Sequence, residues 1–324
     1  MALDHYVPQV HLKRFNAPTL NGKKMYAKRK ADGHAFICGS KDVCRLQEGS
    51  TNAYLSEPRL IEQFLKLVEP NYNRACTALA EGPIKPDAVF AIAGFVASIL
   101  ACSPAAARLG TAPLEELVKV EAAVLDRMGE LPKAPPELGG KTLSELLAEG
   151  AVRIETDSKF PQANGILAVL DLAKSFGNFH WDILINEHPD VPFFTSDFPV
   201  AVEATPDPRI VNRVVPLTPF LAIRICPNLE LAKRKLEPTF QHFSYSRLRP
   251  SRSQIVAVNR MIVRSAEDLV FSSVDAPWVG PFVEKNARFR LENETANRPW
   301  GTGYLSITRT VVRERNVSDS VSRK

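Results

Sequence analysis

One apolar run sets the first limit on the fold. Residues 88–102 read AVFAIAGFVASILAC, fifteen residues without a charge. A helix that spans a bilayer needs about 20 apolar residues, so this run is too short to cross a membrane and predicts a buried helix instead. The rest of the chain must supply the core around it, and 324 residues with 45% hydrophobic content are sufficient for that.

The run lies in a helical zone that we place at 56–178. Before it, apolar side chains recur at helical spacing from Ile61 to Leu79, which predicts a helix with one buried stripe. Pro70 is expected to kink or split that helix because it lacks an N–H. After the run, further helices are predicted at 113–129, 142–149 and 161–175.

Strand-like segments flank the helical zone on both sides. The first zone, 1–50, is β and turn, and the third zone, 179–275, is mainly β with a helix at 251–265. The predicted strands are 25–28, 35–38, 181–185, 191–195, 200–203, 220–226 and 269–271. We therefore expect an α+β fold, with an antiparallel or mixed sheet from N- and C-terminal strands and a central helical layer.

These zones define the domain organisation. Residues 1–275 are assigned to a single α+β domain, and 276–311 to a C-terminal extension. The polar segment 312–324 is expected to be a disordered tail.

Charge and cysteine content limit the partners. The net charge is +5, from 41 basic and 36 acidic residues, which permits a polyanionic partner without requiring one. The five cysteines are odd in number and irregularly spaced, with no C-x-x-C, and no signal peptide is recognised. Reduced thiols, a cytoplasmic location and no membrane partner are the simplest expectation; protein partners are left open.

The opening motif DHYVPQ, residues 4–9, offers the first candidate chemistry. His5 beside Asp4 can hold a metal or move a proton. An Asp-His pair before Val7-Pro8 also resembles the first motif of HNH-type nucleases, in which a histidine acts as general base beside a metal. The rest of that module is not evident, so a structural role for the pair is the simpler interpretation.

Glu62 and Glu69 form the second candidate. Seven residues at about 100° each place them within about 20° of one another on a helix. Two carboxylates at this spacing can hold a divalent ion. The alternative is a solvated helix border, with Lys66 and Arg59 as ion-pair partners.

Asp197 is the third candidate. The motif TSDFPV, residues 195–200, follows an apolar strand and ends in a proline, which fixes the direction of the chain at Asp197. Polar residues at strand ends often serve sites. The alternative is a carboxylate that caps the local turn.

A basic stretch is the fourth. Residues 23–30 carry five positive charges around Tyr26, including Lys28 and Arg29. They could track a phosphate backbone, or equally form a solvated hairpin edge. No Walker loop, G-x-G-x-x-G or G-x-S-x-G occurs, which argues against common nucleotide-driven and serine hydrolase chemistry.

Several segments together resemble one family. The opening His5-Tyr6-Val7-Pro8-Gln9, then a segment ending in Arg14-Phe15, is similar to an uncharacterised family of bacterial and phage-associated proteins, a domain of unknown function. Its members continue with a helix bearing spaced glutamates, a Thr-Ser-Asp-x-Pro-Val motif, a Pro-Leu-Thr-Pro segment and a helix with an asparagine. The resemblance covers about 1–275 and matches these features in order, here as Glu62, Glu69, 195–200, 216–219 and Asn259.

The resemblance implies that these polar residues share one fold. A histidine, carboxylates and amides are the parts of a metal-assisted hydrolase. We therefore expect a metal-dependent nuclease that uses Mg²⁺ or Mn²⁺ in a toxin or defence setting, with nucleic acid as its partner. The roles are assigned as catalytic for His5, Asp197 and Glu62; metal-binding for Glu62, Glu69 and Asp197; and substrate-binding for Gln9, Arg14, Asn259, Lys28 and Arg29.

Two other hypotheses stay open beside the nuclease. The chain could be a non-catalytic module that binds nucleic acid or protein, with its acids paired internally or capping turns. Alternatively, His5 and Asp197 could hydrogen-bond each other and lock the first strand in place. An enzyme that acts on a small molecule is a further reading.

Overall fold

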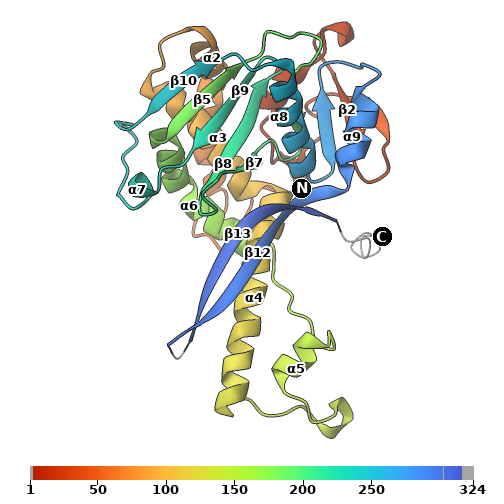
Figure 1. The fold of residues 1–324 in the computed structure, drawn as a ribbon, viewed down its shortest axis with the longest axis vertical. Helices are drawn as coiled ribbons and strands as arrows, with labels where there is room; N and C mark the ends of the chain where they lie inside the picture. Colours follow the sequence, from red (N-terminus) through yellow and green to blue (C-terminus); the bar gives the residue numbers. More distant parts are fainter. Residues whose placement is uncertain (1–2, 302, 316–324) are drawn as a thin grey trace.

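The computed structural model describes residues 3–301 and 303–315. Its largest sheet has five strands in the order β10-β5-β9-β8-β7 (Figure 1). All neighbours are antiparallel except β10 and β5, which are parallel, so the sheet is mixed. The strands are β5 (His180–Ile185), β7 (Ala201–Ala204), β8 (Val211–Thr218), β9 (Leu221–Cys226) and β10 (Ser244–Leu248).

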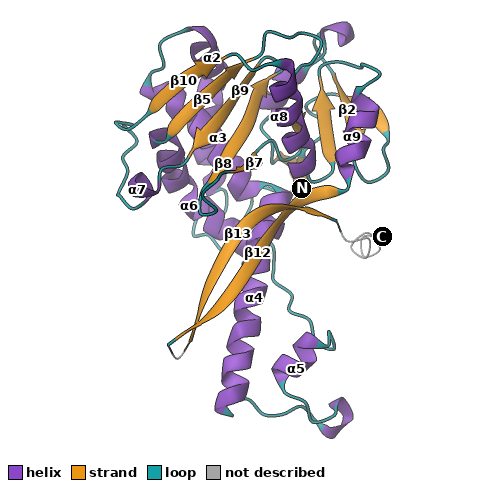
Figure 2. Ribbon diagram, in the orientation of Figure 1, coloured by secondary structure: helices purple, strands orange, loops and turns teal. Residues whose placement is uncertain are grey.

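Helices cover both faces of this sheet (Figure 2). On one face lie α2 (Leu60–Glu81), α3 (Pro86–Cys102) and α6 (Lys159–Asn178), which share the main core with inward strand residues such as Trp181 and Ile223. On the other face lies α8 (Arg252–Ser265), whose Ile255 shares a second core with Leu184. The fold is α+β as expected, and α8 adds a second helical side to the predicted layer.

The apolar run forms α3, in the middle of the main core. Glycines let its neighbours approach closely. A Cβ on Gly94 would lie 2.6 Å from a methyl of Val68 on α2, and one on Gly165 of α6 would lie 3.0 Å from the Cα of Ala101. Over the described residues, no single helix is long and apolar enough to span a membrane.

Helix α2 follows the predicted stripe but runs unbroken through Pro70. A kink or a split was expected at Pro70, and the helix is not split there. A proline removes one main-chain hydrogen bond, and packing of the stripe against α3 holds the turns on either side together. The buried residues of α2 are Ile61, Phe64, Val68, Tyr72, Ala75, Cys76 and Leu79.

A second, antiparallel sheet combines strands from both ends of the predicted domain, in the order β3-β2-β11-β6. Strands β2 (Met25–Arg29) and β3 (Ala35–Cys38) come from the first zone, and β6 (Thr195–Ser196) and β11 (Leu269–Ser272) from the third. Helix α9 (Val279–Ala287) packs on this sheet through Val283. N- and C-terminal strands therefore do share a sheet.

The strand predicted at 191–195 is mostly irregular. The N–H of Phe193 donates to the carbonyl of Pro219 (2.8 Å), and Asn259 binds the main chain on either side of Phe193. These bonds replace a strand partner, so only the end of the segment pairs, as β6.

The opening residues are tied into the fold. Strand β1 (Leu3–His5) pairs antiparallel with β4 (Arg45–Gln47), and His5 lies opposite Arg45. Short helical turns follow, namely α1 (Gln9–Leu12), η1 (Lys13–Phe15) and η2 (Pro18–Leu20).

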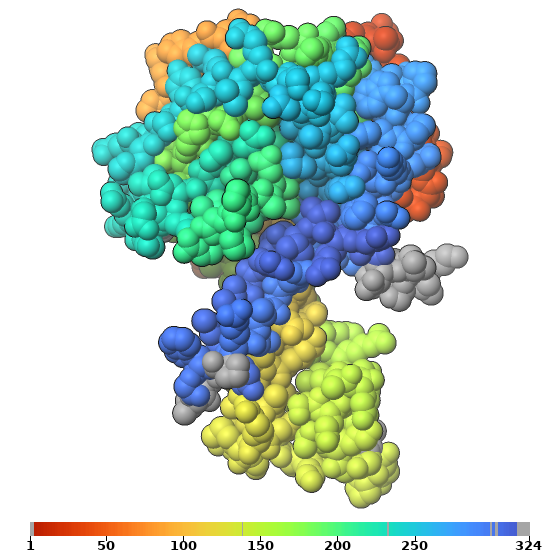
Figure 3. Space-filling view, viewed as in Figure 1, coloured from red at the N-terminus to blue at the C-terminus, as the bar shows by residue number. Residues whose placement is uncertain are grey.

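A stalk extends from this body (Figures 1 and 3). It contains α4 (Pro104–Met128), η3 (Pro136–Leu138), α5 (Leu143–Ala148) and the hairpin of β12 (Phe289–Trp300) with β13 (Gly303–Glu314). Helix α4 begins nine residues before the predicted 113, because Ser103 caps it by accepting the N–H of Ala106 (3.1 Å). The short α7 (Leu229–Ala232) lies outside the stalk.

The C-terminal extension is built onto the body. Val283 of α9 and Leu291 of β12 are buried in the two cores. Residues 312–314 belong to β13 because they pair with Phe289, Arg290 and Leu291, so strand structure replaces the first part of the predicted tail. The rest of that prediction, from 316, lies outside the described residues.

Candidate functional site

A groove of about 510 Å³ lies between β1 and α2. Four of the predicted site residues line it: His5, Gln9, Glu62 and Glu69. The other lining residues are Leu3, Asp4, Ser50, Leu65, Lys66 and Pro70. Residues 60 positions apart in the sequence thus meet at one surface, because β1 runs alongside the first turns of α2.

Asp4 positions β1 at the groove. One carboxylate oxygen accepts the N–H of Ser50 (3.0 Å), and the other accepts from the guanidinium of Arg59 (3.1 Å). The Asp4 side chain is 10% exposed, so solvent screens these contacts weakly. The carboxylate therefore fixes the backbone next to His5 and does not face the solvent itself.

The His5 imidazole is oriented but incompletely bonded. Its ring is hydrogen-bonded by the main chain of Ser40 and Lys41, while Nε2 is buried without a partner among the described residues. The bonded nitrogen is therefore Nδ1. Burial lowers the pKa of His5, against the hydrogen bond to Ser40. The ring is thus neutral near pH 7, with Nε2 as an acceptor.

A small chamber adjoins His5 on the inner side of the groove. It measures about 10 Å³, roughly the space for one water molecule. Ser50 and Leu65 border both the chamber and the groove, and Ser98 and Cys102 close its far end. The His5 ring thus stands between a water-sized chamber and an open groove.

Glu69 and Lys66 occupy the helical wall of the groove. Glu69 forms no ion pair or hydrogen bond with any described residue, and burial raises the pKa of its carboxyl. Lys66 is exposed and likewise forms no ion pair with the described residues. Glu62, by contrast, is held by Arg59, whose Nε donates at 2.9 Å. The predicted carboxylate pair therefore contains one engaged and one unengaged member.

Asp197 lies elsewhere, in the cap that the sequence analysis gave as its alternative role. Its carboxylate accepts three main-chain N–H groups, from Glu267 (2.9 Å), Asp268 (2.7 Å) and Leu269 (2.8 Å). It does not line the groove, and it makes no bond to His5. The set of Glu62, Glu69 and Asp197 is therefore not brought together.

The described residues contain no group of three or more His, Cys, Asp or Glu side chains arranged to hold a metal ion. The reason for this is the geometry of the two candidate regions. Glu62 and Glu69 lie on the surface of α2, whereas Asp197 is 4% exposed and points at the turn before β11.

Asp197 belongs to a buried polar junction. Near it, Nζ of Lys30 donates to the carbonyls of Ala266 (2.5 Å) and Phe289 (2.8 Å). Burial raises the pKa of Asp197 and lowers that of Lys30, and each charge opposes the shift of the other. These contacts join β2, the turn before β11 and the base of the stalk.

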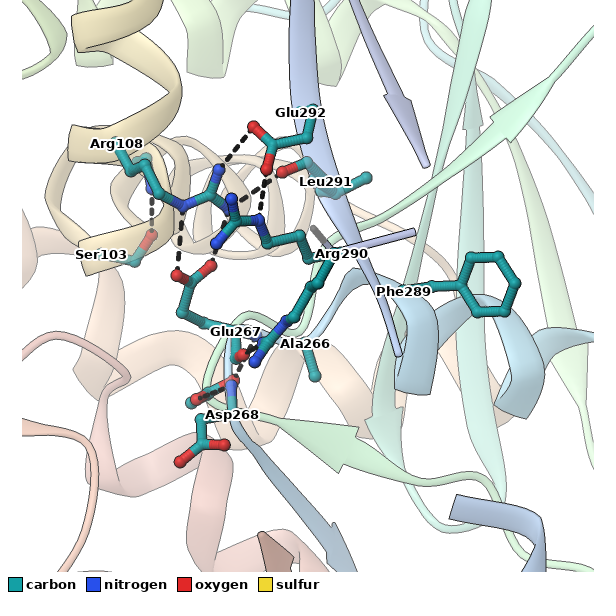
Figure 4. A network of polar contacts seen from close by, with 12 residues as sticks. Ser103, Arg108, Ala266, Glu267, Asp268, Phe289, Arg290, Leu291 and Glu292 are labelled. Carbon is teal, nitrogen blue, oxygen red and sulfur yellow. Dashed lines mark hydrogen bonds and ion pairs between the residues drawn. The ribbon is translucent and has the colours of Figure 1, made fainter. Parts of the chain in front are cut away.

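Arg108 extends this junction into the stalk (Figure 4). Its guanidinium binds both carboxylate oxygens of Glu267 (3.1 and 2.8 Å), a carboxylate oxygen of Glu292 (3.0 Å) and the carbonyl of Leu291 (2.9 Å). Charge-assisted, two-pronged bonding of this kind fixes the position of α4 against β12.

His11 is bonded close to the junction, through Thr195, which lies two residues before Asp197. Its Nδ1 lies 2.7 Å from Oη of Tyr72, and its Nε2 lies 2.7 Å from Oγ1 of Thr195. The ring stacks on Phe95. Burial lowers the pKa of His11 to about 3, so the ring is neutral and both nitrogens are bonded. This histidine holds β6 against α2.

The remaining predicted binding residues also lie outside the groove. Asn259 donates to the carbonyl of Pro192 (2.8 Å) and accepts the N–H of Phe194 (2.9 Å), which engages both of its amide atoms. Lys28 pairs with Glu284, and Arg29 with Asp32.

Arg14 lies close to the buried cluster of His11, Tyr72 and Cys76. Burial lowers the pKa of His11 and raises those of Tyr72 and Cys76, and the charge of Arg14 adds to the first shift and opposes the other two. Arg14 does not line the groove. Of the five residues expected to bind substrate, only Gln9 lies there.

Two features at the groove were not predicted from the sequence. Lys66 was taken as an ion-pair partner, although its place four residues after Glu62 and three before Glu69 puts it on the same helix face. Arg59 holds Asp4 and Glu62 together across 55 positions. No sequence pattern indicates the contact between Arg59 and Asp4.

Comparison with known proteins gives a single family. A family model described as "Protein of unknown function (DUF4238)" matches residues 4–276. No curated protein matches the chain, and neither does any solved structure.

Proposed function

The chain belongs to the DUF4238 family, whose description assigns no activity, and from its own geometry we propose that the groove between β1 and α2 is the active site of a hydrolase. The observation that carries the proposal is the neutral His5 ring, which borders a chamber for one water and whose buried Nε2 has no partner among the described residues. Unsatisfied buried polar atoms are rare and call for an explanation.

His5 acts as the general base. Nε2 accepts a proton from the water in the chamber, and the water oxygen attacks the substrate in the groove. Because main-chain contacts fix Nδ1–H, the ring needs no reorientation to take this proton. A base whose pKa lies below its ordinary value is unprotonated at neutral pH, which is the state required.

Glu69 acts as the general acid. Its raised pKa increases the fraction of carboxyl that is protonated near neutral pH, so it can give a proton to the departing alkoxide. The reaction balances: one proton goes from water to His5, and one goes from Glu69 to the leaving group. Among the described residues that line the groove, Lys66 is a cation without an ion-pair partner and can contact an anionic substrate.

Phosphodiesters are the proposed substrate class. The mildly basic chain and the exposed Lys66 support it, as does the resemblance of the opening motif to a nuclease motif. Mg²⁺ or Mn²⁺ would be an added reactant that neutralises charge on the phosphate. Glu62, once released by Arg59, is the carboxylate of α2 that would contact the ion, while Glu69 keeps its proton as the general acid.

The test is hydrolysis of total RNA, plasmid DNA and bis(p-nitrophenyl) phosphate with Mg²⁺, with Mn²⁺ and with a chelator. On RNA and DNA, we expect His5→Ala and Glu69→Gln each to lower the rate by about 10²- to 10⁴-fold, the usual contribution of a positioned base or acid. On bis(p-nitrophenyl) phosphate, only His5→Ala should have this effect, because p-nitrophenolate leaves without taking up a proton. His34→Ala is the matched control, because His34 is exposed on β2–β3 and outside the groove.

Hydrolysis that persists in His5→Ala would contradict the assignment of the base. No hydrolysis by the wild type under any condition would favour the non-catalytic binding module instead. A rate that falls only in the chelator, with both variants inactive, would identify the divalent ion as a co-reactant.

A further inference from the structure

A second cavity, of about 350 Å³, lies between β2, β3 and β11 on one side and the first turn of α9 on the other. Most of its lining is apolar: Ala35 and Ile37 from β3, and Val274, Pro277 and Val279 from the approach to α9. Small-molecule sites are typically cavities of 300 to 1,000 Å³ with such a lining and a few polar groups. Its lining and that of the proposed active site have no residue in common.

One cation lies inside this cavity. The Lys28 side chain is 14% exposed, and its Nζ would lie 3.1 Å from a Cβ placed on Gly280, so it rests over the first turn of α9. A helix start carries partial positive charge from its free N–H groups. Lys28 and the helix start therefore favour an anion at the same point.

The carboxylate that now pairs with Lys28 belongs to Glu284, a largely exposed side chain. Oε1 of Glu284 lies 2.8 Å from Nζ of Lys28, but the Glu284 side chain is 60% exposed and does not line the cavity. Because the Glu284 carboxylate is mostly in solvent, water screens its side of the ion pair. A ligand carboxylate could replace Glu284 at little cost, since Glu284 would return to water.

We infer that this cavity binds a small amphipathic carboxylate. The ligand carboxylate takes the place of Glu284 on Lys28, and its apolar chain lies against Ile37, Val274 and Val279. The other lining charge, Asp275, is exposed, so solvent screens it more than Lys28, whose side chain is 14% exposed. The buried positive charge of Lys28 therefore favours a ligand with a negative charge.

The experiment is calorimetric titration of the full chain with octanoate, octanol and octylamine. We expect octanoate to bind best. Lys28→Met keeps the apolar stem and should weaken octanoate at least tenfold, while octanol binding stays unchanged. Glu284→Gln should strengthen octanoate binding several-fold, because it removes the competing carboxylate. Lys119→Met is the matched control, since Lys119 pairs with Glu116 (2.6 Å) on the stalk.

Three results would overturn the inference: tighter binding of octylamine than of octanoate, no binding of octanoate, or an unchanged affinity in Glu284→Gln. If Lys28→Met does not fold, Glu284→Gln still decides, because Glu284 is an exposed side chain. Ile37→Ser, at a half-exposed position, then tests the apolar contact and should weaken both octanoate and octanol.

Discussion

The groove at His5 and the junction at Asp197 use the same side-chain types and satisfy them differently. At the junction, Asp197 accepts three N–H groups and both ring nitrogens of His11 are bonded. At the groove, Nε2 of His5 and the carboxylate of Glu69 have no partner among the described residues. Fully bonded polar groups hold a fold together, whereas unbonded ones are available to a ligand.

Because the junction is the fully bonded region, we expect the largest loss of folding stability on replacement of Asp197. Replacement by alanine leaves three part-buried N–H groups without their acceptor and removes one of the negative charges near Lys30. We expect Asp197→Ala to lower the free energy of unfolding by about 3–5 kcal/mol. Urea denaturation at 25 °C measures it.

Asp171→Ala is the control, because Asp171 is 80% exposed and pairs with Lys174 on the surface. It should change the free energy of unfolding by less than about 0.5 kcal/mol. A loss below about 1 kcal/mol in Asp197→Ala would mean that the junction is not the rigid region.

The next effect concerns pH and His11. Its folded-state pKa is about 3, below the ordinary value of 6.5, so the unfolded chain takes up the proton first. The stability that the neutral ring supplies is complete above pH 6.5 and is lost as pH falls toward 3, by about 1.4 kcal/mol per pH unit. From pH 6.5 to 4 this amounts to about 3 kcal/mol.

Denaturation curves across that range compare the wild type with His11→Gln, which cannot titrate. The variant should be less stable at pH 7 but have a shallower pH slope. His5→Gln is the groove counterpart and should alter the slope less, since the His5 ring is only partly buried. Equal slopes in wild type and His11→Gln would rule out His11 as the source.

The smallest effect is expected at Glu69, with the opposite sign. Burial raises the folded-state pKa of Glu69, so its charged form is a cost near neutral pH that disappears as pH falls through that pKa. Glu69→Gln removes the charge and should leave stability unchanged or raise it by less than about 1 kcal/mol, because solvent screens a half-exposed group.

Thermal unfolding at pH 7 measures this effect beside Glu62→Gln. That variant loses part of its bond to Arg59 and should be slightly less stable than the wild type. A melting temperature of Glu69→Gln well below that of Glu62→Gln would show that Glu69 supports the fold. The groove and the junction would then differ less in how their polar groups contribute to stability.

Periodicity located most of the regular elements. The stripe from Ile61 to Leu79 and the helix at 252–265 follow their sequence patterns closely, since each buries one face in a core. Strand β8 and the hairpin β12–β13 were not predicted. Their stability comes from pairing with neighbouring strands, β7 and β9 for β8 and each other for β12 and β13, which the pattern within one segment does not record.

The site was predictable in part for a similar reason. Glu62 and Glu69 share a helix face by spacing alone, and the motif containing His5 was distinctive. Whether a carboxylate caps a turn or faces a groove depends on where the next segment passes. Asp197 caps a turn because the N–H groups of 267–269, about 70 residues later in the chain, lie next to its carboxylate.

Helix α2 passes through Pro70, so the carbonyl of Lys66 lacks the N–H that would close its helical bond. Both residues line the groove. One residue of its helical wall thus carries a main-chain oxygen whose usual helical donor is missing. A ligand with an amide N–H or an exocyclic amine at that point would gain a hydrogen bond. An isostere with a carbonyl there would bind more weakly because of oxygen–oxygen repulsion. A helix irregularity thereby becomes a means of telling two similar molecules apart.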